Sequence, residues 1–380
     1  MKEFILDILP LREWIDFGVH PLIISGPCSA ESREQVMSTA KKLAETGLVK
    51  VFRAGLWKPR TRPDSFEGVG AIGLKWLQEV KAVTGMLISV EVANAEHVEL
   101  SLKHNIDILW IGARTTGNPF SVQEIAEALK GIDIPVMVKN PVNPDIGLWL
   151  GALERINHAG IRKLIAIHRG FYAYNSMPYR NAPIWEIPIE LMRLCPKLPV
   201  ICDPSHITGN YLLLESVSQK AIDLEMDGLM IETHVNPQKA LSDSGQQITP
   251  AELKELTSKL VIRSHYPGNS EFRDMLEQLR SEIDVIDAEL IHLLSKRMHL
   301  VEQIGNYKKE NNITILQIKR WNNIVRESLE LGENLGLNKE FLVKLLRVIH
   351  EESIQKQMEI FNNSCYANVP ISKQKIDDSK

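Results

Sequence analysis

Short apolar runs that end on polar residues recur along the first two-thirds of the chain. Eight of these runs are typical of β-strands and cover residues 22–25, 49–53, 87–91, 108–111, 136–139, 164–167, 200–202 and 228–231. The segments between them have the spacing of helices, at residues 35–46, 70–84, 95–104, 122–130, 148–159, 188–194 and 211–223. Strict alternation of strand and helix predicts right-handed crossover connections and therefore a parallel sheet.

Eight strand–helix units over about 240 residues match the α/β architecture of the (β/α)8 TIM barrel, which is the fold that we predict here. The alternative is an open, doubly wound sheet with helices on both faces. We favour the barrel because no glycine-rich dinucleotide-binding turn follows the first strand.

The pattern changes near residue 263. Residues 263–270 contain Pro-Gly-Asn and predict a linker. Apolar residues then recur at helical spacing over 271–306, which predicts one helix of about 35 residues, far above the average of about 11–12. Two more helices are expected at 318–331, ended by Gly332, and at 339–361, and the polar residues 362–380 predict a disordered tail.

The predicted domains are therefore a barrel over 1–262, a linker over 263–270, an all-α three-helix domain over 271–361 and a tail over 362–380. Three helices cannot bury the apolar stripe of such a long helix by themselves. We therefore expect a homodimer formed through the helical domain, or a higher oligomer built on it.

Composition and charge narrow the choice of partners and location. The 380 residues are 44% hydrophobic and 24% charged, and their net charge of −4 argues against a nucleic-acid partner. No apolar run is long enough to span a membrane. The four cysteines are too few and too widely spaced for a disulfide framework, and acidic residues within the N-terminal apolar stretch argue against a signal peptide, so we expect a cytoplasmic protein.

Four side chains of metal-ligand type follow three of the predicted strands. They are Cys28, His206, Glu232 and Asp243. A lone cysteine is more often a small buried hydrophobe, and a lone histidine after a strand is a cap or core residue as often as a ligand. Together at one rim of a barrel, this mixed donor set suits a divalent transition metal, with Mn²⁺, Fe²⁺, Co²⁺ and Zn²⁺ all open.

Cationic side chains also gather at the predicted strand ends. They are Arg53, Lys58, Arg60, Arg114, Lys139 and Arg169. Any one of them alone is more often a surface salt-bridge partner. Several cations converging on a small space indicate an anionic substrate with more than one phosphate or carboxylate.

The motifs at these strand ends resemble a known family. GPCSAES (26–32), FRAGLWKPRT (52–61), WIGART (110–115), DPSH (203–206) and the later IETH and ALSD segments look like 3-deoxy-D-arabino-heptulosonate 7-phosphate (DAHP) synthase of the type Iβ kind, over about residues 1–262. The resemblance implies a TIM-barrel enzyme that condenses phosphoenolpyruvate with erythrose 4-phosphate. It also implies that the four ligand-type residues bind the metal, for which Mn²⁺ is the first expectation.

The resemblance assigns further residues one by one. Arg114, Lys139 and Arg169 match the grip on the phosphate of phosphoenolpyruvate, and Arg53 and Lys58 match its carboxylate side. Arg60 and Thr61 match the aldose-phosphate motif. Asp203 is expected to face the aldehyde substrate, and we take Lys58 as the candidate general acid toward the aldehyde oxygen.

The chain differs from many members of this family at two places, and a rival family is also similar to it. Arg62 stands where many members have Ser, and Asn140-Pro141 where the family often has Arg-Gly. The rival is 3-deoxy-octulosonate 8-phosphate synthase, which uses arabinose 5-phosphate and has Ala-Asn-Arg-Ser after the lysine. Pro59-Arg60-Thr61 in this chain favours the four-carbon aldose.

The helical third resembles a second family. Residues 279–308 are similar to the first helix of the all-helical chorismate mutases, and the likeness extends over about 271–361. It implies that Arg280, Arg297, Lys308, Arg320, Ser353 and Gln357 form the site that rearranges chorismate to prephenate. The arginines would hold the two carboxylates, while Lys308 and Gln357 donate to the ether oxygen.

Arg280 cannot share one small ligand with Arg297, because about 25 Å of helix separates them. A dimer could supply Arg280 from the other chain. Gln317 and Trp321 depart from the family, which often has Asp and Glu at these positions. In relatives that Glu contacts the hydroxyl of the substrate.

Two functions are open for the helical part. In the first, the chain is a bifunctional enzyme in which prephenate or chorismate also inhibits the synthase. In the second, the helical part is mainly a sensor of these compounds with little turnover. Because the first strand begins near residue 21, we expect no regulatory domain before the barrel, so regulation would act through the helical part.

Overall fold

The computed structural model describes residues 5–18, 21–58, 66–263 and 270–362. The chain divides into two compact units, Met1–Arg263 and Ser264–Lys380, each of which is described by itself. Most of the predicted linker and nearly all of the predicted tail lie outside the described residues. No helix in the described part of the chain combines the length and the apolar character needed to cross a membrane.

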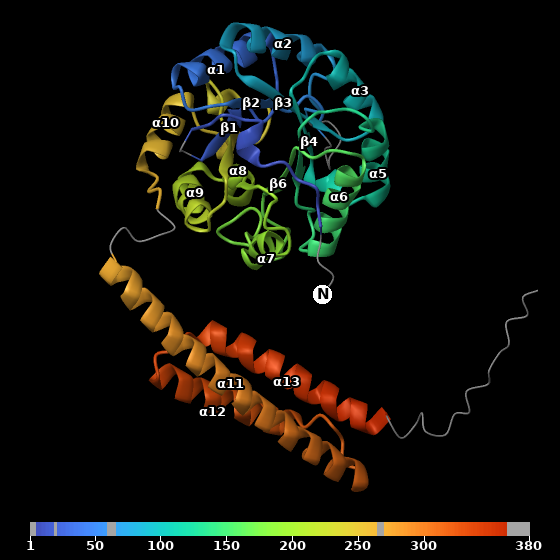
Figure 1. The fold of residues 1–380 in the computed structure, drawn as a ribbon, viewed down its shortest axis with the longest axis vertical. Helices are drawn as coiled ribbons and strands as arrows, with labels where there is room; N and C mark the ends of the chain where they lie inside the picture. Colours follow the sequence, from blue (N-terminus) through green and yellow to red (C-terminus); the bar gives the residue numbers. More distant parts are fainter. Residues whose placement is uncertain (1–4, 19–20, 59–65, 264–269, 363–380) are drawn as a thin grey trace, which may run out of the picture. The chain divides into compact units, whose positions relative to one another are not determined.

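The first unit is a closed barrel of eight parallel strands in sequence order, surrounded by helices (Figure 1). The strands are β1 (Leu22–Gly26), β2 (Val51–Ala54), β3 (Leu87–Val92), β4 (Ile108–Ile111), β5 (Val136–Lys139), β6 (Leu164–His168), β7 (Val200–Cys202) and β8 (Gly228–Glu232). The pairing of β1 with β8 closes the ring. The predicted barrel is confirmed, and the open-sheet alternative is wrong.

Helices follow the strands along the chain. They are α1 (Arg33–Glu45), α2 (Ile72–Thr84), α3 (Ala95–Lys103), α4 (Ala113–Thr116), α5 (Pro119–Ala128), α6 (Ile146–His158), α7 (Glu186–Leu194), α8 (Pro204–Thr208), α9 (Leu214–Asp223) and α10 (Pro250–Lys259). All but the two shortest, α4 and α8, cover the outside of the barrel. Short 3₁₀ turns lie at Leu11–Glu13, Tyr211–Leu213, Pro237–Lys239 and Ser244–Gln246.

The helix after the eighth strand, α10, was missed in the sequence. Its start carries a local signal, because Thr249 and Glu252 form a capping box in which each side chain binds the backbone N–H of the other. Pro250 at the first helical position adds to this signal.

Side chains alternate along the strands between the barrel interior and an outer layer. The inner cluster includes Leu22, Ile24, Val51, Trp110 and Met230. Leu11, Ile15 and Phe17, from the segment before β1, belong to the same cluster, so this segment closes the amino-terminal end of the barrel.

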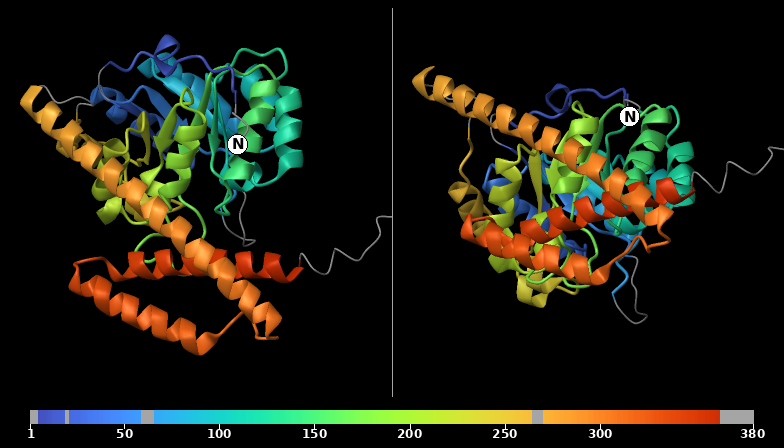
Figure 2. Two further views of the ribbon diagram at one scale, coloured as in Figure 1. Left: turned by 60° about the horizontal axis from the view of Figure 1, so that its bottom comes forward. Right: turned by 90° about the horizontal axis from the view of Figure 1, so that it is seen from below.

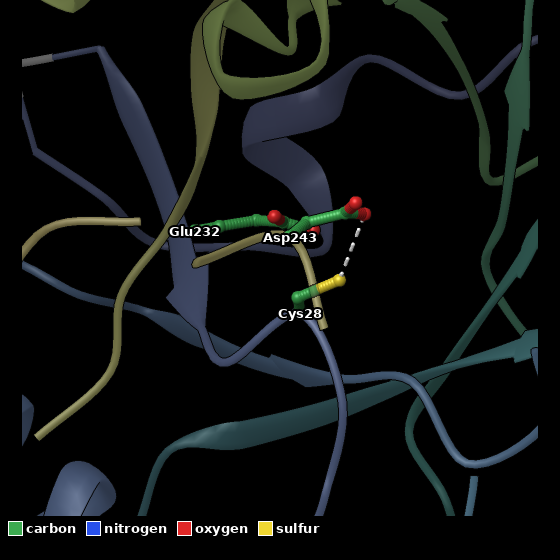
Figure 3. A group of neighbouring side chains, drawn as sticks. All are labelled: Cys28, Glu232 and Asp243. Atoms are coloured by element: carbon green, nitrogen blue, oxygen red, sulfur yellow. Dashed lines mark hydrogen bonds between the residues drawn. The ribbon is translucent and has the colours of Figure 1, made fainter. Parts of the chain in front are cut away.

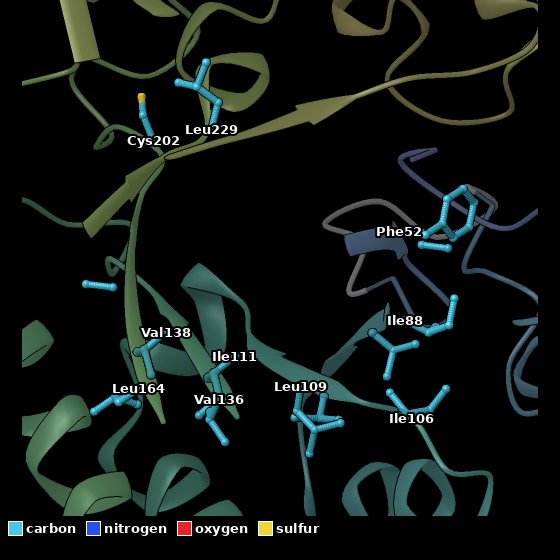
Figure 4. Close-up of a cluster of buried hydrophobic side chains, with 14 of the residues drawn as sticks. Phe52, Ile88, Ile106, Leu109, Ile111, Val136, Val138, Leu164, Cys202 and Leu229 are labelled. Atoms are coloured by element: carbon cyan, nitrogen blue, oxygen red, sulfur yellow. The ribbon is translucent and has the colours of Figure 1, made fainter. Parts of the chain in front are cut away.

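The outward-facing side chains pack against the helices and form the larger core. Figure 4 shows part of this layer, in which Phe52, Ile88, Leu109, Val136 and Leu229 are buried between strands and helices. This layer is the larger of the two hydrophobic clusters, and burial of apolar side chains is the main term that favours folding.

The second unit consists of three helices, with α13 packed against both other helices (Figure 2). They are α11 (Ser270–Glu310), α12 (Ile318–Asn334) and α13 (Lys339–Asn362). The predicted long helix is present and spans 41 residues.

The predicted end of the second helix at Gly332 is wrong, because α12 continues to Asn334. Gly332 lies against α13, since a Cβ atom there would overlap the side chain of Leu342 unless that side chain shifted. The chain turns instead at Gly336, which has a left-handed φ of +78°.

Replacing a buried leucine of the outer core should destabilise the barrel. Leu153 on α6 is fully buried, so Leu153→Ala is expected to lower the free energy of unfolding by about 2–5 kcal/mol through lost burial and a cavity. Leu212 is 71% exposed, and Leu212→Ala should change it by less than about 0.5 kcal/mol. Urea unfolding followed by tryptophan fluorescence would measure both, and equal midpoints would contradict the assignment of this core.

Candidate functional site

The two-residue period of the strands places a layer of charge above the apolar interior. Arg53, Lys139, Asp203 and Glu232 each lie two positions after a residue of the inner cluster, and Glu91 lies four positions after Leu87, which packs against that cluster. All but Glu91 are buried, with exposed fractions of 4% or less. This layer forms the floor of the candidate site.

Three potential metal ligands converge at the rim. Ligand atoms of Cys28, Glu232 and Asp243 all lie within 4.8 Å of one another (Figure 3). The Cys28 thiol donates to Asp243 Oδ2 over 3.4 Å. Burial raises the pKa of this thiol to about 11, and the charge of Glu232 adds to the shift, so the cluster is one that a divalent cation would stabilise.

His206, the fourth predicted ligand, lies beside this cluster. Its Nδ1 is 2.8 Å from Asp203 Oδ2, and its Nε2 is 3.8 Å from Glu232 Oε1. Burial lowers the pKa of His206, which favours the neutral ring. A neutral ring whose Nδ1 carries the proton beside Asp203 leaves the Nε2 lone pair available on the side of Glu232, as in many metal-binding histidines.

Asp203 contacts the side chains of both Lys139 and His206. Lys139 Nζ lies 2.7 Å from the Asp203 oxygen that also contacts His206. Burial alone would raise the pKa of Asp203, but His206 and Lys139 outweigh it and hold the pKa well below its usual range. Asp203 therefore stays ionised and fixes both neighbours.

Arg53 is buried under the site. It is 3.1 Å from Glu232 Oε1, donates to the Cys28 carbonyl over 3.2 Å and lies 4.8 Å from the ring centre of Trp110. Trp110 in turn donates to Glu91 over 3.2 Å. Arg53 is not among the residues that line the cavity described next.

A cavity of about 340 Å³ opens above these residues. Its lining consists of Lys58, Glu91, Gly112, Ala113, Arg114, Lys139, Val142, Arg169, Tyr172, Arg180, Asn181, His206 and Asp243. Five of these side chains are cationic and two are carboxylates, so the cavity favours a small anionic ligand.

Lys58 and Arg169 approach the cavity from different strand ends. Lys58 Nζ lies 3.1 Å from Cys28 Sγ, which joins the lysine to the ligand cluster. Arg169 donates to Asn181 Oδ1 over 2.8 Å, and burial lowers its pKa to about 10. Asn140 Oδ1 accepts a hydrogen bond from the backbone N–H of Arg169 over 2.7 Å. Asn140, which stands where the family often has Arg, therefore helps to fix the position of Arg169.

The remaining predicted aldose contacts cannot be placed. Arg60 and Thr61, together with the departure at Arg62, lie outside the described residues.

Several site residues were missed in the sequence. Arg180 Nη1 is 3.1 Å from Asp243 Oδ1 and donates to Gln246 Oε1 over 2.7 Å. Gln246 Nε2 donates to Glu232 Oε2 over 2.7 Å, so this buried amide and Arg180 together link the two carboxylates of the cluster.

The neighbouring Gln247 fixes the other side of the cluster. Its Oε1 accepts the backbone N–H of Cys28 over 3.0 Å, and its Nε2 donates to the Ser242 carbonyl over 2.8 Å. Asp243 itself has a left-handed φ of 46°. The paired glutamines three and four positions after Asp243 are the sequence signal of this support.

In the helical unit, four predicted residues gather between α11, α13 and the segment before α12. Arg297 donates to Ser353 Oγ over 2.6 Å, and Lys308 donates to the Ile315 carbonyl over 2.6 Å. Gln357 donates to the Ser353 carbonyl over 3.1 Å, and its Oε1 is buried without a hydrogen-bond partner among the described residues.

The other two predicted residues of this site lie apart from these contacts. Arg280 is an exposed side chain that pairs with Glu277 over 2.7 Å, and Arg320 is also exposed. Two other side chains, Trp321 and His350, lie beside the four gathered residues. Their rings are stacked, with centroids 3.8 Å apart. His350 has no motif or spacing in the sequence that marks it as a site residue.

Comparison with known proteins gives two family matches. The DAHP synthetase I family matches residues 15–264, and the chorismate mutase type II family matches residues 279–358.

Individual relatives agree with the first match. The phospho-2-dehydro-3-deoxyheptonate aldolase of Thermotoga maritima is 35% identical over 238 residues, which are 63% of this chain and 68% of that protein. The 2-dehydro-3-deoxyphosphooctonate aldolase of Syntrophotalea carbinolica is 25% identical over 286 residues, which are 70% of this chain and 99% of that protein.

Solved structures give the same result. The crystal structure of the Thermotoga maritima DAHP synthase has a TM-score of 0.58 at 32% identity and covers 66% of this chain and 75% of that one. The truncated form of 3-deoxy-D-arabino-heptulosonate 7-phosphate synthase from Thermotoga maritima has a TM-score of 0.55 at 30% identity and covers 70% of this chain and 92% of that one. Both resemblances predicted from the motifs are confirmed: the chain belongs to the DAHP synthetase I family, and a chorismate mutase type II domain follows the barrel in the same chain.

Proposed function

We propose that the barrel condenses phosphoenolpyruvate with erythrose 4-phosphate and water to give DAHP and phosphate. The observation that carries this proposal is the cation-rich cavity directly beside the cluster of Cys28, Glu232 and Asp243. Both substrates are small phosphorylated compounds, and phosphoenolpyruvate also has a carboxylate, so the charge of the cavity suits them.

Cys28, His206, Glu232 and Asp243 would hold the divalent metal, with Mn²⁺ as the first expectation and Fe²⁺, Co²⁺ or Zn²⁺ as alternatives. When bound, the metal supplies a Lewis acid that polarises the aldehyde oxygen of the four-carbon sugar. The carboxylates suit this role because Arg53 and Arg180, which contact them, favour their ionised forms.

The other residues act on phosphoenolpyruvate. Arg114, Lys139 and Arg169 line the cavity and would hold its phosphate. Lys58 would lie on the carboxylate side and give a proton to the aldehyde oxygen as the methylene carbon of phosphoenolpyruvate forms the new C–C bond. Water then adds to the carbon that carries the phosphate, and the bond from that carbon to the phosphate oxygen breaks.

The burial of Arg53 refines its predicted role on the carboxylate side. Its contacts with Glu232 and with the Cys28 carbonyl are buried, so Arg53 would also set the positions of Glu232 and Cys28 beside the carboxylate of phosphoenolpyruvate. Asp203 would face the aldehyde substrate and would also orient His206 and Lys139.

The four-carbon aldose is preferred to arabinose 5-phosphate. Pro59-Arg60-Thr61 supports this choice. The heptonate aldolase of Thermotoga maritima is also more similar to this chain, at 35% identity, than the octonate aldolase of Syntrophotalea carbinolica, at 25%. An assay of the full chain with each aldose phosphate tests the choice, and faster turnover of the five-carbon sugar would reverse it.

For the helical unit we propose the rearrangement of chorismate to prephenate in a homodimer. Arg297 and Lys308 are half-buried cations near the buried side chains of Ser353 and Gln357, which suits a dicarboxylate ligand. Apolar residues along α11, such as Leu279, Ile283 and Leu290, are more than half exposed in the single chain. A partner chain would cover them and could contribute its Arg280, while Arg320 completes the carboxylate contacts.

A sensor of prephenate or chorismate that inhibits the synthase remains the second candidate. The observation that favours it is the loss of the acidic side chains at Gln317 and Trp321. Measuring synthase turnover of the full chain with and without prephenate tests the feedback.

Removing the thiol of Cys28 should abolish metal-dependent synthase activity. Cys28→Ala is expected to lose more than about 100-fold in turnover. Replacing a residue that only supports a metal ligand already costs about 10–100-fold, and the loss of a ligand itself costs more. The cobalt–thiolate absorption band of the Co²⁺-loaded protein should also disappear. Cys195→Ala, which changes a buried cysteine outside the cluster, should retain both, and an intact band in Cys28→Ala would refute the ligand assignment.

Breaking the link between the two carboxylates should weaken metal binding without removing a ligand. Gln246→Met keeps the volume but loses both hydrogen bonds, so the Co²⁺ dissociation constant should rise about 10–100-fold. Spectroscopic titration of the metal-free protein measures this constant directly. The exposed Gln238→Met is the matched control, and equal affinities of the two variants would show that Gln246 does not position the carboxylates.

Removing the charge of Lys308 should impair the mutase alone. Lys308→Met is expected to lower kcat/KM for chorismate by about 10²–10³-fold, since a donor to the ether oxygen acts on charge that develops in the transition state. Lys344→Met, at an exposed position of α13, is the control, and synthase turnover should be unchanged in both. If the unmodified chain does not consume chorismate at all, the sensor alternative is supported instead.

A further inference from the structure

His350 presents an unsatisfied nitrogen on the same side of α13 as two residues of the candidate mutase site. Ser353 and Gln357 follow it by three and seven positions, which places all three side chains on one face of the helix. His350 Nε2 is buried and has no hydrogen-bond partner among the described residues. A buried polar atom of this kind carries a free-energy cost unless a ligand or water satisfies it.

The position of the His350 ring is fixed by Trp321. The two rings are stacked, with centroids 3.8 Å apart and an angle of 10° between their planes. Trp321 belongs to the first turns of α12, so the stack joins α12 to α13 beside the site. The imidazole therefore has a set orientation before any ligand binds.

The charged groups around His350 keep its ring neutral. Burial lowers the pKa of His350, and the charges of Arg297 and Lys308 on α11 lower it further, while Glu351 on its own helix acts in the opposite direction. A neutral imidazole can donate or accept one hydrogen bond at Nε2, according to its tautomer.

We propose that His350 binds the ring hydroxyl of chorismate and that Trp321 is the residue that positions it. This inference rests on the proposed binding of chorismate or prephenate by the helical unit. Chorismate offers two carboxylates, one ether oxygen and one hydroxyl. The cations suit the carboxylates, and Lys308 and Gln357 suit the ether oxygen, which leaves the hydroxyl for a neutral donor or acceptor.

The sequence supports this assignment independently. Gln317 and Trp321 replace acidic residues, so this chain lacks the carboxylates that its family often has there. Gln317 is exposed and makes no side-chain hydrogen bond at the start of α12. The stacked pair therefore stands where the acidic side chains are absent, and its imidazole has a buried nitrogen close to Arg297 and Lys308.

The test compares two variants of the full chain with two ligands. His350→Leu removes the nitrogen, and His350→Gln keeps an amide nitrogen near the position of Nε2. The ligands are chorismate and an analogue that lacks the ring hydroxyl. Because a hydroxyl contact made equally in the ground and transition states changes mainly binding, His350→Leu should raise KM for chorismate about tenfold with little change in kcat.

The analogue separates a hydroxyl contact from a structural role of the stack. The unmodified chain and His350→Gln should prefer chorismate to the analogue, whereas His350→Leu should bind both with similar affinity. His292→Leu, at an exposed position of α11, should behave like the unmodified chain. If His350→Leu keeps the full preference for chorismate, His350 only fills space beside Trp321 and the proposal is wrong.

The outcome for His350 can be told apart from the outcome for the mutase. If the unmodified chain binds chorismate but does not turn it over, dissociation constants from calorimetry replace KM in the same comparison. Absent turnover then counts against the proposed activity, while the preference for the hydroxyl still decides the role of His350. Far-ultraviolet circular dichroism of each variant verifies that the three helices are retained.

Discussion

The buried ion pair of Arg53 and Glu232 is the interaction on which the barrel site depends. Both side chains are almost completely removed from water, where an unpaired charge would be very unfavourable. Arg53 also holds the Cys28 carbonyl, so one guanidinium sets the positions of two potential ligands from neighbouring strands. Gln246 donates a hydrogen bond to Glu232 and accepts one from Arg180. Because Arg180 also pairs with Asp243, the position of Asp243 is coupled to that of Glu232.

The sequence was sufficient to predict most of the barrel and its rim. Strand periodicity identified β4, β5 and β7 at their observed bounds, and the polar residues after the strands included Cys28 and Glu232. It was not sufficient for Arg180 and Gln246, because their placement depends on the path of loops that have no periodic pattern. Gly332 was misread for a related reason: its lack of a side chain serves contact with α13 rather than helix termination.

The helical unit shows how a departure in sequence acquires meaning from structure. Trp321 alone suggested a loss of substrate contact, whereas its stack on His350 points to a replacement. No spacing rule could have paired these residues, since they lie on different helices and meet only when α12 and α13 pack together. The same unit leaves apolar residues of α11, such as Leu279 and Ile283, more than half exposed.

The closed amino-terminal end of the barrel has a kinetic consequence. Leu11, Ile15 and Phe17 pack into the inner cluster beneath the charged layer, and the interior above them is filled with side chains. The cavity is therefore closed on the side of the inner cluster. Two ligands that share such a cavity bind in a fixed order, in which the ligand nearer the floor binds before the outer one. Products formed near the floor leave only after the outer position is empty.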